Sequence, residues 1–292
     1  MIKVHIEKPF KAFLPEAEAY LRYFEKDGRF DASIQDPGRA AQLEPDVELR
    51  FFGVVPRWGS RAPILVGDYN SMSTGHLPRI KDVIKRTINK KPDIALTLNA
   101  EVTRRLGLQP SEVLSRPMGY FGNLVQPRST PLFDLVYSGS ISRPTVMSNL
   151  NRLAGLGLKI VIVGAEAPHG AHSRLEFAGP QPIEAVYKIY SKARFGLNIT
   201  PVRYPYYFQD STKVIEYSAS GLGVVTNMYP WVCDFSKRRN GRFLDVTKVH
   251  SLADMKSFTF RVPDVRNLEW ESVLSRTDLA NRIVSKMDRT TP

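Results

Sequence analysis

The chain has 292 residues, of which 42% are hydrophobic and 24% are charged, and its formal net charge is +12. These numbers describe a folded globular protein that is long enough for two domains of ordinary size. The single cysteine, Cys233, excludes an internal disulfide bond and a cysteine-based zinc site.

The net positive charge indicates a negatively charged partner, such as nucleic acid, anionic lipid or a phosphorylated substrate. The basic residues are spread along the chain and no nucleic-acid recognition motif is visible, so nucleic-acid binding is the remote alternative. No apolar run approaches the roughly 20 residues that span a bilayer, and the first residues lack the apolar region of a signal peptide. We therefore expect a cytoplasmic protein, either free or peripheral on the cytoplasmic face of the inner membrane.

Short apolar runs alternate with helical patterns, which favours an α/β architecture with parallel sheets. Strands are expected at Ile2–Ile6, Val47–Val54, Ile64–Val66, Ile94–Leu98, Leu135–Ser138, Lys159–Val163, Leu175–Phe177, Gly196–Ile199 and Val224–Thr226. Helices are expected at Leu14–Glu25, Leu77–Asn89, Ala100–Leu106, Thr145–Gly155, Ile183–Ser191, Ser211–Ser220 and Leu268–Lys286.

Two residues of the first half are candidates for a catalytic base. Asp68 follows the strand Ile64–Val66, at the carboxyl end where ligands bind in parallel α/β sheets. His76 lies in the loop that follows and is the alternative. A carboxylate or an imidazole at such a place can take a proton from an attacking hydroxyl group. The other interpretations are a capping or turn aspartate and an ordinary loop histidine.

The segment Leu77–Asn89 is predicted to be an amphipathic helix with basic residues on its outer face. The apolar residues that fall at helical spacing are Ile80, Val83, Ile84 and Ile88. The basic residues are Lys81, Lys85 and Arg86, with Lys90 and Lys91 after them. This face suits an anionic membrane surface or a lipid-diphosphate acceptor, or it is a solvated helix face.

Residues 116–133 contain three prolines and two glycines without sustained periodicity, which indicates a boundary between domains. The boundaries that we predict are residues 1–130 for a short first domain, 131–266 for a second, and 267–292 for a C-terminal helix that packs back on the first.

The second domain begins with a strand that runs into Gly139 and Ser140, followed by Arg143 and a helix. Small residues at the end of a strand let a ligand approach the backbone, and an arginine there can bind a diphosphate. The alternative is a plain turn between strand and helix. Further on, the backbone around Gln181 can pair with the edge of a nucleobase, or it is an ordinary connection.

The segment from Tyr207 to Glu216 carries the strongest indication of a ligand site. Asp210, Ser211 and Thr212 are residue types that cap helix N-termini, where anions bind. Lys213 follows in the first turn, where a cation opposes the helix dipole, so a negative ligand is indicated. Glu216 lies on the same side of the helix and suits ribose hydroxyl groups. Tyr207, one of three tyrosines in this loop, suits the stacking of a sugar or base.

The order of these elements resembles the donor-binding domain of GT-B glycosyltransferases, over roughly Leu135–Asn227. The family pattern K-x-x-E-Y-x-A-x-G-x-P-V-V stands here as Lys213, Glu216, Tyr217, Ala219, Gly221, Val224 and Val225, with Gly223 in place of proline. Within this fold the second domain resembles that of the group 1, family 4-like enzymes, and the likeness extends to the membrane-associated glucuronosyltransferases of the xanthan type.

The resemblance implies two Rossmann-like domains that face each other across a cleft, and transfer of a sugar from a UDP- or GDP-linked donor. The implied acceptor is a glycan or a lipid-linked diphosphate in polysaccharide synthesis, and no metal is implied, because helix termini and basic residues hold the diphosphate. Retaining members carry two glutamates with seven residues between them; Glu216 can be the second, and the first would fall at position 208, where this chain has Phe208. An inverting reaction with Asp68 as base is therefore favoured over a retaining one. The further alternative is a relative that binds a nucleotide without catalysis.

Overall fold

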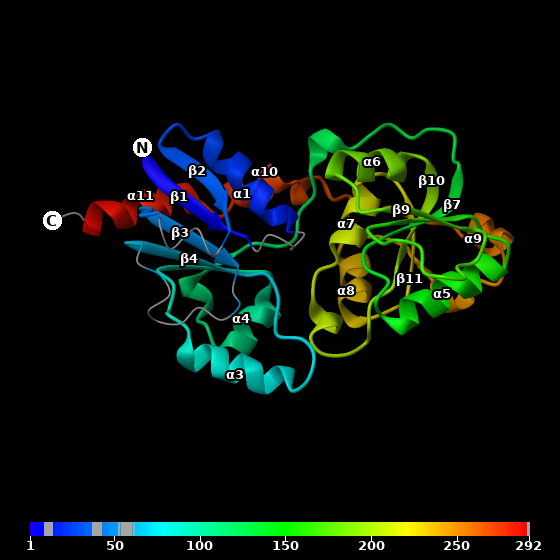
Figure 1. Ribbon diagram of the computed structural model, residues 1–292, viewed down its shortest axis with the longest axis horizontal. Helices are drawn as coiled ribbons and strands as arrows, with labels where there is room; N and C mark the ends of the chain where they lie inside the picture. Colours follow the sequence, from blue (N-terminus) through cyan, green and yellow to red (C-terminus); the bar gives the residue numbers. More distant parts are fainter. Residues whose placement is uncertain (9–13, 37–42, 52, 54–59, 61, 291–292) are drawn as a thin grey trace. The chain divides into compact units, whose positions relative to one another are not determined.

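The computed structural model describes residues 1–8, 14–36, 43–51, 53, 60 and 62–290, and these residues form two compact units (Figure 1). Unit 1 comprises Met1–Gly119, Phe208–Asp210 and Trp270–Pro292. Unit 2 comprises Tyr120–Tyr207 and Ser211–Glu269. The chain therefore leaves each unit and returns to it.

Unit 1 is built on a parallel six-stranded sheet with the order β2-β1-β3-β4-β5-β6. Its strands are β1 Ile2–Glu7, β2 Phe30–Gln35, β3 Val47–Phe51, β4 Ile64–Tyr69, β5 Ile94–Thr97 and β6 Val113–Ser115. Four of them were expected, although residues 52 and 54 of the expected Val47–Val54 lie outside the described residues. Neither β2 nor β6 was expected, because β2 is a largely polar edge strand and β6 has only three residues.

The helices of unit 1 that carry the argument are α1 Pro15–Glu25, α3 Pro78–Ile88, α4 Ala100–Leu106, α10 Trp270–Ser275 and α11 Leu279–Thr290. The last two replace the single helix that was expected at Leu268–Lys286. The break between them includes Asp278, whose φ of 54° is left-handed and cannot continue a helix.

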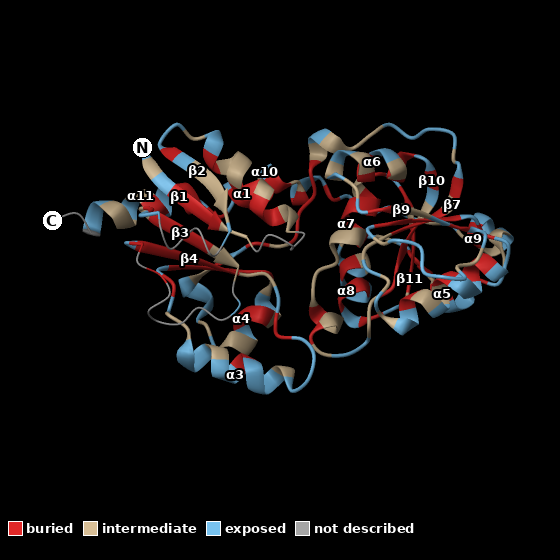
Figure 2. Cartoon of the chain, in the orientation of Figure 1, coloured by how far each residue is buried: buried red, intermediate tan, exposed pale blue. Residues whose placement is uncertain are grey.

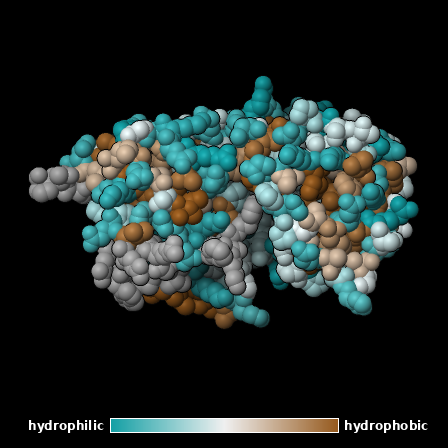
Figure 3. All heavy atoms as spheres, turned by 45° about the horizontal axis from the view of Figure 1, so that its top comes forward, coloured by the Kyte–Doolittle hydropathy of each residue, from teal (hydrophilic) through white to brown (hydrophobic). Residues whose placement is uncertain are grey.

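Helix α3 has its apolar side chains on the surface, which the sequence pattern did not indicate (Figure 2). Asp82 is its one buried residue, and the Asp82 carboxylate accepts a hydrogen bond of 2.9 Å from the backbone N–H of Ser73. Hydrophobic side chains accordingly gather at the lower margin in Figure 3, where α3 lies. The helix is amphipathic as predicted, but its polar side holds it to unit 1.

Unit 2 is built on a second parallel six-stranded sheet, with the order β12-β11-β10-β7-β8-β9. Its strands are β7 Phe133–Ser138, β8 Ile160–Val163, β9 Leu175–Gly179, β10 Ala193–Asn198, β11 Gly223–Thr226 and β12 Leu244–Asp245, and only β12 was not expected. Its helices are α5 Pro144–Gly155, α6 Ile183–Ser191, α7 Thr212–Ala219, α8 Pro230–Arg238 and α9 Leu252–Ser257, and the last two were not expected.

The strand order of unit 2 reverses between β7 and β10, because β8 and β9 continue on one side and β11 and β12 on the other. Ligands of open parallel sheets bind at the carboxyl ends of the strands on either side of such a reversal. The fold thus directs attention to the ends of β7 and β10. The two parallel sheets with interleaved helices confirm the predicted α/β fold class.

Candidate functional site: the carboxyl ends of the unit 2 strands

Three glycines with left-handed backbone lie at the carboxyl ends of β7, β8 and β9. They are Gly139, Gly164 and Gly179, with φ angles of 133°, 94° and 66°. The Gly139 N–H donates to the Val163 carbonyl at 2.8 Å, and the Gly164 N–H donates to the Gly179 carbonyl at 2.8 Å. These bonds hold the three turns side by side, and the missing side chains leave the strand ends open to a ligand.

The Lys213 side chain lies against Gly139. A Cβ atom added to Gly139 would come within 2.8 Å of Lys213 Cε and 3.0 Å of Lys213 Nζ. The φ angle of Gly139 favours glycine at this position, and the absence of a side chain leaves room for the end of the lysine. The sequence predicted both residues as parts of one donor site, and the structure brings them together.

The Lys213 ammonium group has no hydrogen-bond acceptor and no ion-pair partner among the described residues. The side chain is half-buried, and burial lowers the pKa of Lys213; Glu216 opposes this shift and Arg143 adds to it. A half-buried cation without a counter-ion is costly unless a ligand supplies the negative charge. The geometry thus suits an anion between the end of β7 and the start of α7.

Helix α7 begins at the carboxyl end of β10, and Ser211 is its N-cap residue. The Ser211 hydroxyl accepts a bond from the Val214 N–H at 3.3 Å and donates to Asn198 Oδ1 at 3.0 Å. Asn198 ends β10, so these two bonds fix the helix start to the strand end. Thr212 occupies the first helical position, where backbone N–H groups point out of the helix.

Asp210 does not cap α7, contrary to the sequence prediction. Its carboxylate accepts bonds from Asn99 Nδ2 at 3.0 Å and from the Met118 N–H at 3.2 Å, all within unit 1. Asn99 in turn caps α4 by accepting from the Val102 N–H at 3.0 Å. Sequence proximity to α7 suggested the capping role, whereas long-range partners determine where this side chain lies.

Glu216 is buried in a network of hydroxyl groups at the end of β7. Tyr190 donates to Glu216 Oε2 at 2.9 Å. The Tyr190 hydroxyl also lies 2.8 Å from Ser138 Oγ, and the Tyr217 hydroxyl lies 3.3 Å from the same atom. Ser138 is the last residue of β7, so the network joins Glu216 to the strand end that carries Gly139.

The sequence analysis did not identify Ser138, Tyr190 or the hydroxyl group of Tyr217 as parts of this site. Tyr217 was noted only as a member of the family pattern, and Tyr190 was given no role. The available signal was their hydroxyl groups, because a buried tyrosine requires a hydrogen-bond partner and Glu216 is a carboxylate on the same helix as Tyr217.

The remaining predicted donor residues lie in unit 2 and make local contacts. Arg143 is the N-cap residue of α5, and its guanidinium carbon lies 4.8 Å from the ring centre of Tyr206. The exposed Ser140 hydroxyl donates to Ser142 Oγ at 2.9 Å. Gln181 follows the edge strand β9 and donates to the Ala178 carbonyl. Tyr207 is half-buried in a short 3₁₀ turn, Tyr206–Phe208.

Asp68 in unit 1 is fully buried, and each of its carboxylate oxygens accepts a hydrogen bond. Arg116 donates to Asp68 Oδ1 at 2.7 Å, and the Tyr20 hydroxyl donates to Asp68 Oδ2 at 2.9 Å. Burial raises the pKa of Asp68, and its bonds to Arg116 and Tyr20 oppose this shift. Because the carboxylate is fully buried, a substrate hydroxyl group can reach it only if the residues around it move. His76, by contrast, is exposed in the loop before α3, and the role of either residue as a base stays a prediction.

The buried cluster around Asp68 includes charges that the sequence analysis did not connect with it. Arg116 has no exposed surface, and its guanidinium carbon lies 5.6 Å from the ring centre of Trp270. Glu16 is 3% exposed; Asn70 donates to its Oε1 at 3.4 Å, and its Oε2 has no partner among the described residues. Burial raises the pKa of Glu16, although Arg116 opposes the shift. No local pattern links positions this far apart in the sequence.

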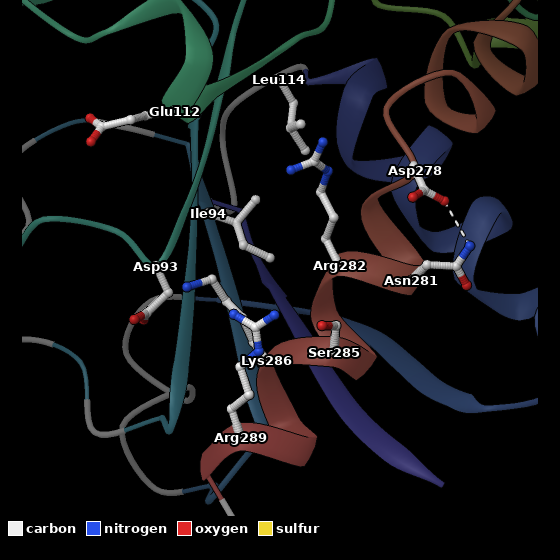
Figure 4. Close-up of a pocket in the computed structure, with 10 residues that line it drawn as sticks. All are labelled: Asp93, Ile94, Glu112, Leu114, Asp278, Asn281, Arg282, Ser285, Lys286 and Arg289. Atoms are coloured by element: carbon white, nitrogen blue, oxygen red, sulfur yellow. Dashed lines mark hydrogen bonds between the residues drawn. The ribbon is translucent and has the colours of Figure 1, made fainter.

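A pocket of about 420 Å³ lies elsewhere in unit 1, between α11 and the sheet (Figure 4). Arg282, Lys286 and Arg289 line it together with Asp93 and Glu112. Asp93 precedes β5 and Glu112 precedes β6, so the pocket lies at the amino ends of these strands. It is therefore separate from the strand edge at which ligands of such sheets bind.

The described part of the chain has neither a candidate metal cluster nor a candidate membrane-spanning helix. No three His, Cys, Asp or Glu side chains lie where they could hold a metal ion together, and the metal-free donor site stays a prediction. Within the same residues, no helix has the length and apolar character needed to cross a membrane.

No protein-family model and no curated protein matches this sequence, whereas many solved structures share its fold. A glycosyltransferase involved in avilamycin A biosynthesis, AviGT4, superposes with a TM-score of 0.66 at 10% identity, covering 98% of both chains. Anabaena HepE, in complex with UDP and glucose, gives 0.62 at 10% identity over 99% of this chain and 98% of its own. The fold is GT-B.

The same fold also occurs in enzymes that do not transfer sugars. A UDP-GlcNAc 2-epimerase from Methanocaldococcus jannaschii gives a TM-score of 0.55 at 9% identity, over 95% of this chain and all of its own. At such low identities the likeness shows the fold alone. The predicted likeness to the xanthan-type enzymes stays a prediction.

Proposed function

We propose that this chain is a glycosyltransferase that moves a sugar from a nucleotide-diphosphate donor to a glycan or lipid-linked acceptor. The observation that carries the proposal is the unpaired Lys213 ammonium group beside Gly139, at the strand reversal of unit 2. A diphosphate is the ligand that supplies what this place lacks, namely negative charge and hydrogen-bond acceptors. The use of UDP is supported by HepE, which shares the fold and holds UDP and glucose.

In this proposal the diphosphate lies at the start of α7 and the nucleoside extends towards Glu216. Lys213 and Arg143 neutralise the phosphates, while the first-turn N–H groups near Ser211 and Thr212 donate to phosphate oxygens. Glu216, held by Tyr190, accepts from ribose hydroxyl groups. Gln181 and Tyr207 contact the base or sugar. The leaving diphosphate is thus stabilised by protein cations and helix N–H groups, which is why we expect no metal.

The proposed reaction is an inverting transfer. The acceptor hydroxyl oxygen forms a bond to the anomeric carbon, the bond from that carbon to the diphosphate oxygen breaks, and the nucleoside diphosphate leaves. The hydroxyl proton passes to a base, for which Asp68 is the first candidate and His76 the alternative. A positioned base contributes roughly 10²–10⁴-fold to such a step. Unit 1 supplies the acceptor side, and a polysaccharide or lipid-diphosphate acceptor fits the basic character of the chain.

A second candidate function is the rearrangement of a nucleotide-sugar without transfer, because a UDP-GlcNAc 2-epimerase shares the fold. A retaining transferase and a non-catalytic nucleotide-binding relative are the further alternatives. These functions differ in the fate of the nucleotide. Transfer releases it, whereas epimerisation and simple binding leave it attached to the sugar.

The test is to incubate the protein with UDP- and GDP-sugars, each with and without a membrane-lipid extract as acceptor. We expect release of the nucleoside diphosphate that depends on the acceptor and fails in Lys213→Ala. The control variant is Lys188→Ala, which removes an exposed lysine of α6 in the same unit. An isomerised sugar that is still attached to its nucleotide would identify the epimerase instead, and tight binding without turnover would identify the non-catalytic relative.

A further inference from the structure

The surface of α3 carries an apolar stripe, broken by Thr87, that nothing in the described structure covers. Leu77, Ile80, Val83, Ile84 and Ile88 are between 41% and 67% exposed. At about 100° per residue these side chains fall on one side of the helix, and Asp82 lies on the opposite side, bonded to the Ser73 N–H. Five large apolar side chains on one exposed face are more than the scattered exposure of an ordinary surface.

Basic residues border the stripe on both sides. Lys81 and Lys85 follow Ile80 and Ile84 on one side, while Arg79 and Arg86 lie on the other. Asp82, the one acidic residue of α3, is buried, so no carboxylate of the helix shares this surface. An apolar face with a basic border is the arrangement of helices that lie in the interface of an anionic membrane.

A pocket of about 210 Å³ opens beside the C-terminal half of α3. Lys85, Arg86, Lys90 and Lys91 line it, together with Asp82 and Asn89. Lys85 and Lys90 have no acceptor or ion-pair partner among the residues that the structure describes. Because Asp82 also lines this pocket, the pocket lies on the side of α3 that faces unit 1. The unpaired ammonium groups of Lys85 and Lys90 therefore add positive charge to the border of the stripe, and that charge suits the phosphate groups of a phospholipid surface.

We propose that α3 docks this protein on the surface of an anionic lipid bilayer. The apolar stripe enters the boundary between headgroups and acyl chains, and the basic border contacts headgroup phosphates. A second copy of the chain is a poorer occupant, because a two-fold contact through this face would bring the basic borders of the two copies together. This docking is independent of the donor site in unit 2.

The experiment measures co-sedimentation with vesicles of phosphatidylcholine alone and of phosphatidylcholine with phosphatidylglycerol. We expect binding to the anionic vesicles only, weakened by salt. The double variant Ile80→Glu/Ile84→Glu should bind at least about tenfold more weakly, because it places charge in the stripe. The matched control Leu132→Glu/Val262→Glu changes two exposed apolar residues of unit 2 and should bind like the wild type.

The basic border is tested by Lys85→Gln/Lys90→Gln, which should weaken binding roughly fivefold for each charge removed. Nucleotide affinity and the urea unfolding curve of every variant should match those of the wild type, which separates this test from that of the donor site. The proposal is overturned if the wild-type protein does not bind anionic vesicles, or if the stripe variant binds them as tightly as the wild type does. A dimer in light scattering that the stripe variant dissociates, without vesicle binding, assigns the face to a second copy instead.

Discussion

At the scale of single residues, the candidate site depends on where each charge finds a partner. Lys213 could be singled out from the sequence, because a lysine in the first turn of a capped helix opposes the helix dipole. The burial of Asp68 could not, because Arg116 and Tyr20 each lie 48 residues from it along the chain. A local pattern thus indicates an unusual residue, and only the fold shows its partners.

The Asp68–Arg116 pair should be essential to the stability of unit 1. Asp68→Ala leaves the Arg116 guanidinium buried without its counter-ion, and we expect the free energy of unfolding to fall by about 3–5 kcal/mol. Asp288→Ala, which removes an exposed aspartate of α11, should change it by less than about 0.5 kcal/mol. Urea unfolding followed by circular dichroism measures both values.

Equal stability of the two variants would contradict the structural role of Asp68. The expected destabilisation also matters for the mechanism, because a loss of activity in Asp68→Ala would then reflect loss of the fold. Asp68→Asn, which keeps the shape of the side chain, is the variant to compare with His76→Ala when the base is assigned.

Glu16 should make the stability of the protein fall as the pH rises. Burial raises the pKa of Glu16 above its ordinary value, which the unfolded chain retains. As the pH rises from the ordinary value through the raised one, the unfolded chain loses this proton first, so the native state loses stability. Glu16→Gln stays neutral, so its advantage over the wild type should grow across this window and then level off. Urea unfolding at a series of pH values measures this difference, and parallel curves for the two proteins would contradict it.

At the scale of elements, the packing of α7 on β10 positions the residues of the candidate donor site. Gly196 in β10 lies under Tyr217 of α7, and a Cβ atom there would overlap the Tyr217 ring. We expect Gly196→Ala to lower the free energy of unfolding by about 1–3 kcal/mol and to weaken donor binding, because it displaces Tyr217 from Ser138. Gly155→Ala in α5 is the control, since its Cβ atom meets nothing within 4 Å. Gly196→Ala with wild-type stability and donor affinity would contradict this account.

The helices also show what periodicity can and cannot predict. The bounds of α4 and α6 agree with the expected ones, because their apolar residues face the core in the usual way. The same periodicity located α3 correctly, but it could not reveal that Asp82 faces inward and the apolar residues outward. An amphipathic pattern gives two faces, and the side that is buried depends on what the rest of the fold offers.

At the scale of the whole molecule, the chain forms two α/β units, each built on one parallel sheet. Each unit carries its own candidate functional residues. The alternation of strands and helices was sufficient to predict this fold class. The short or polar strands β2, β6 and β12 escaped prediction, because tertiary pairing rather than their own sequence makes them strands. The proximity of Lys213 to Gly139 could be expected from the sequence, since both lie at the ends of elements that meet at one sheet edge, and the role of this place as a donor site stays a prediction.

The most direct test of the account is the binding of UDP and GDP, measured by titration calorimetry, to the wild type, Lys213→Ala and Lys188→Ala. We expect the wild type and Lys188→Ala to bind one of the nucleotides with equal affinity. Lys213→Ala should bind it at least about tenfold more weakly, because a charge-assisted bond to the diphosphate is lost. Unchanged affinity in a folded Lys213→Ala variant, or no binding of either nucleotide by the wild type, would contradict the assignment of the donor site.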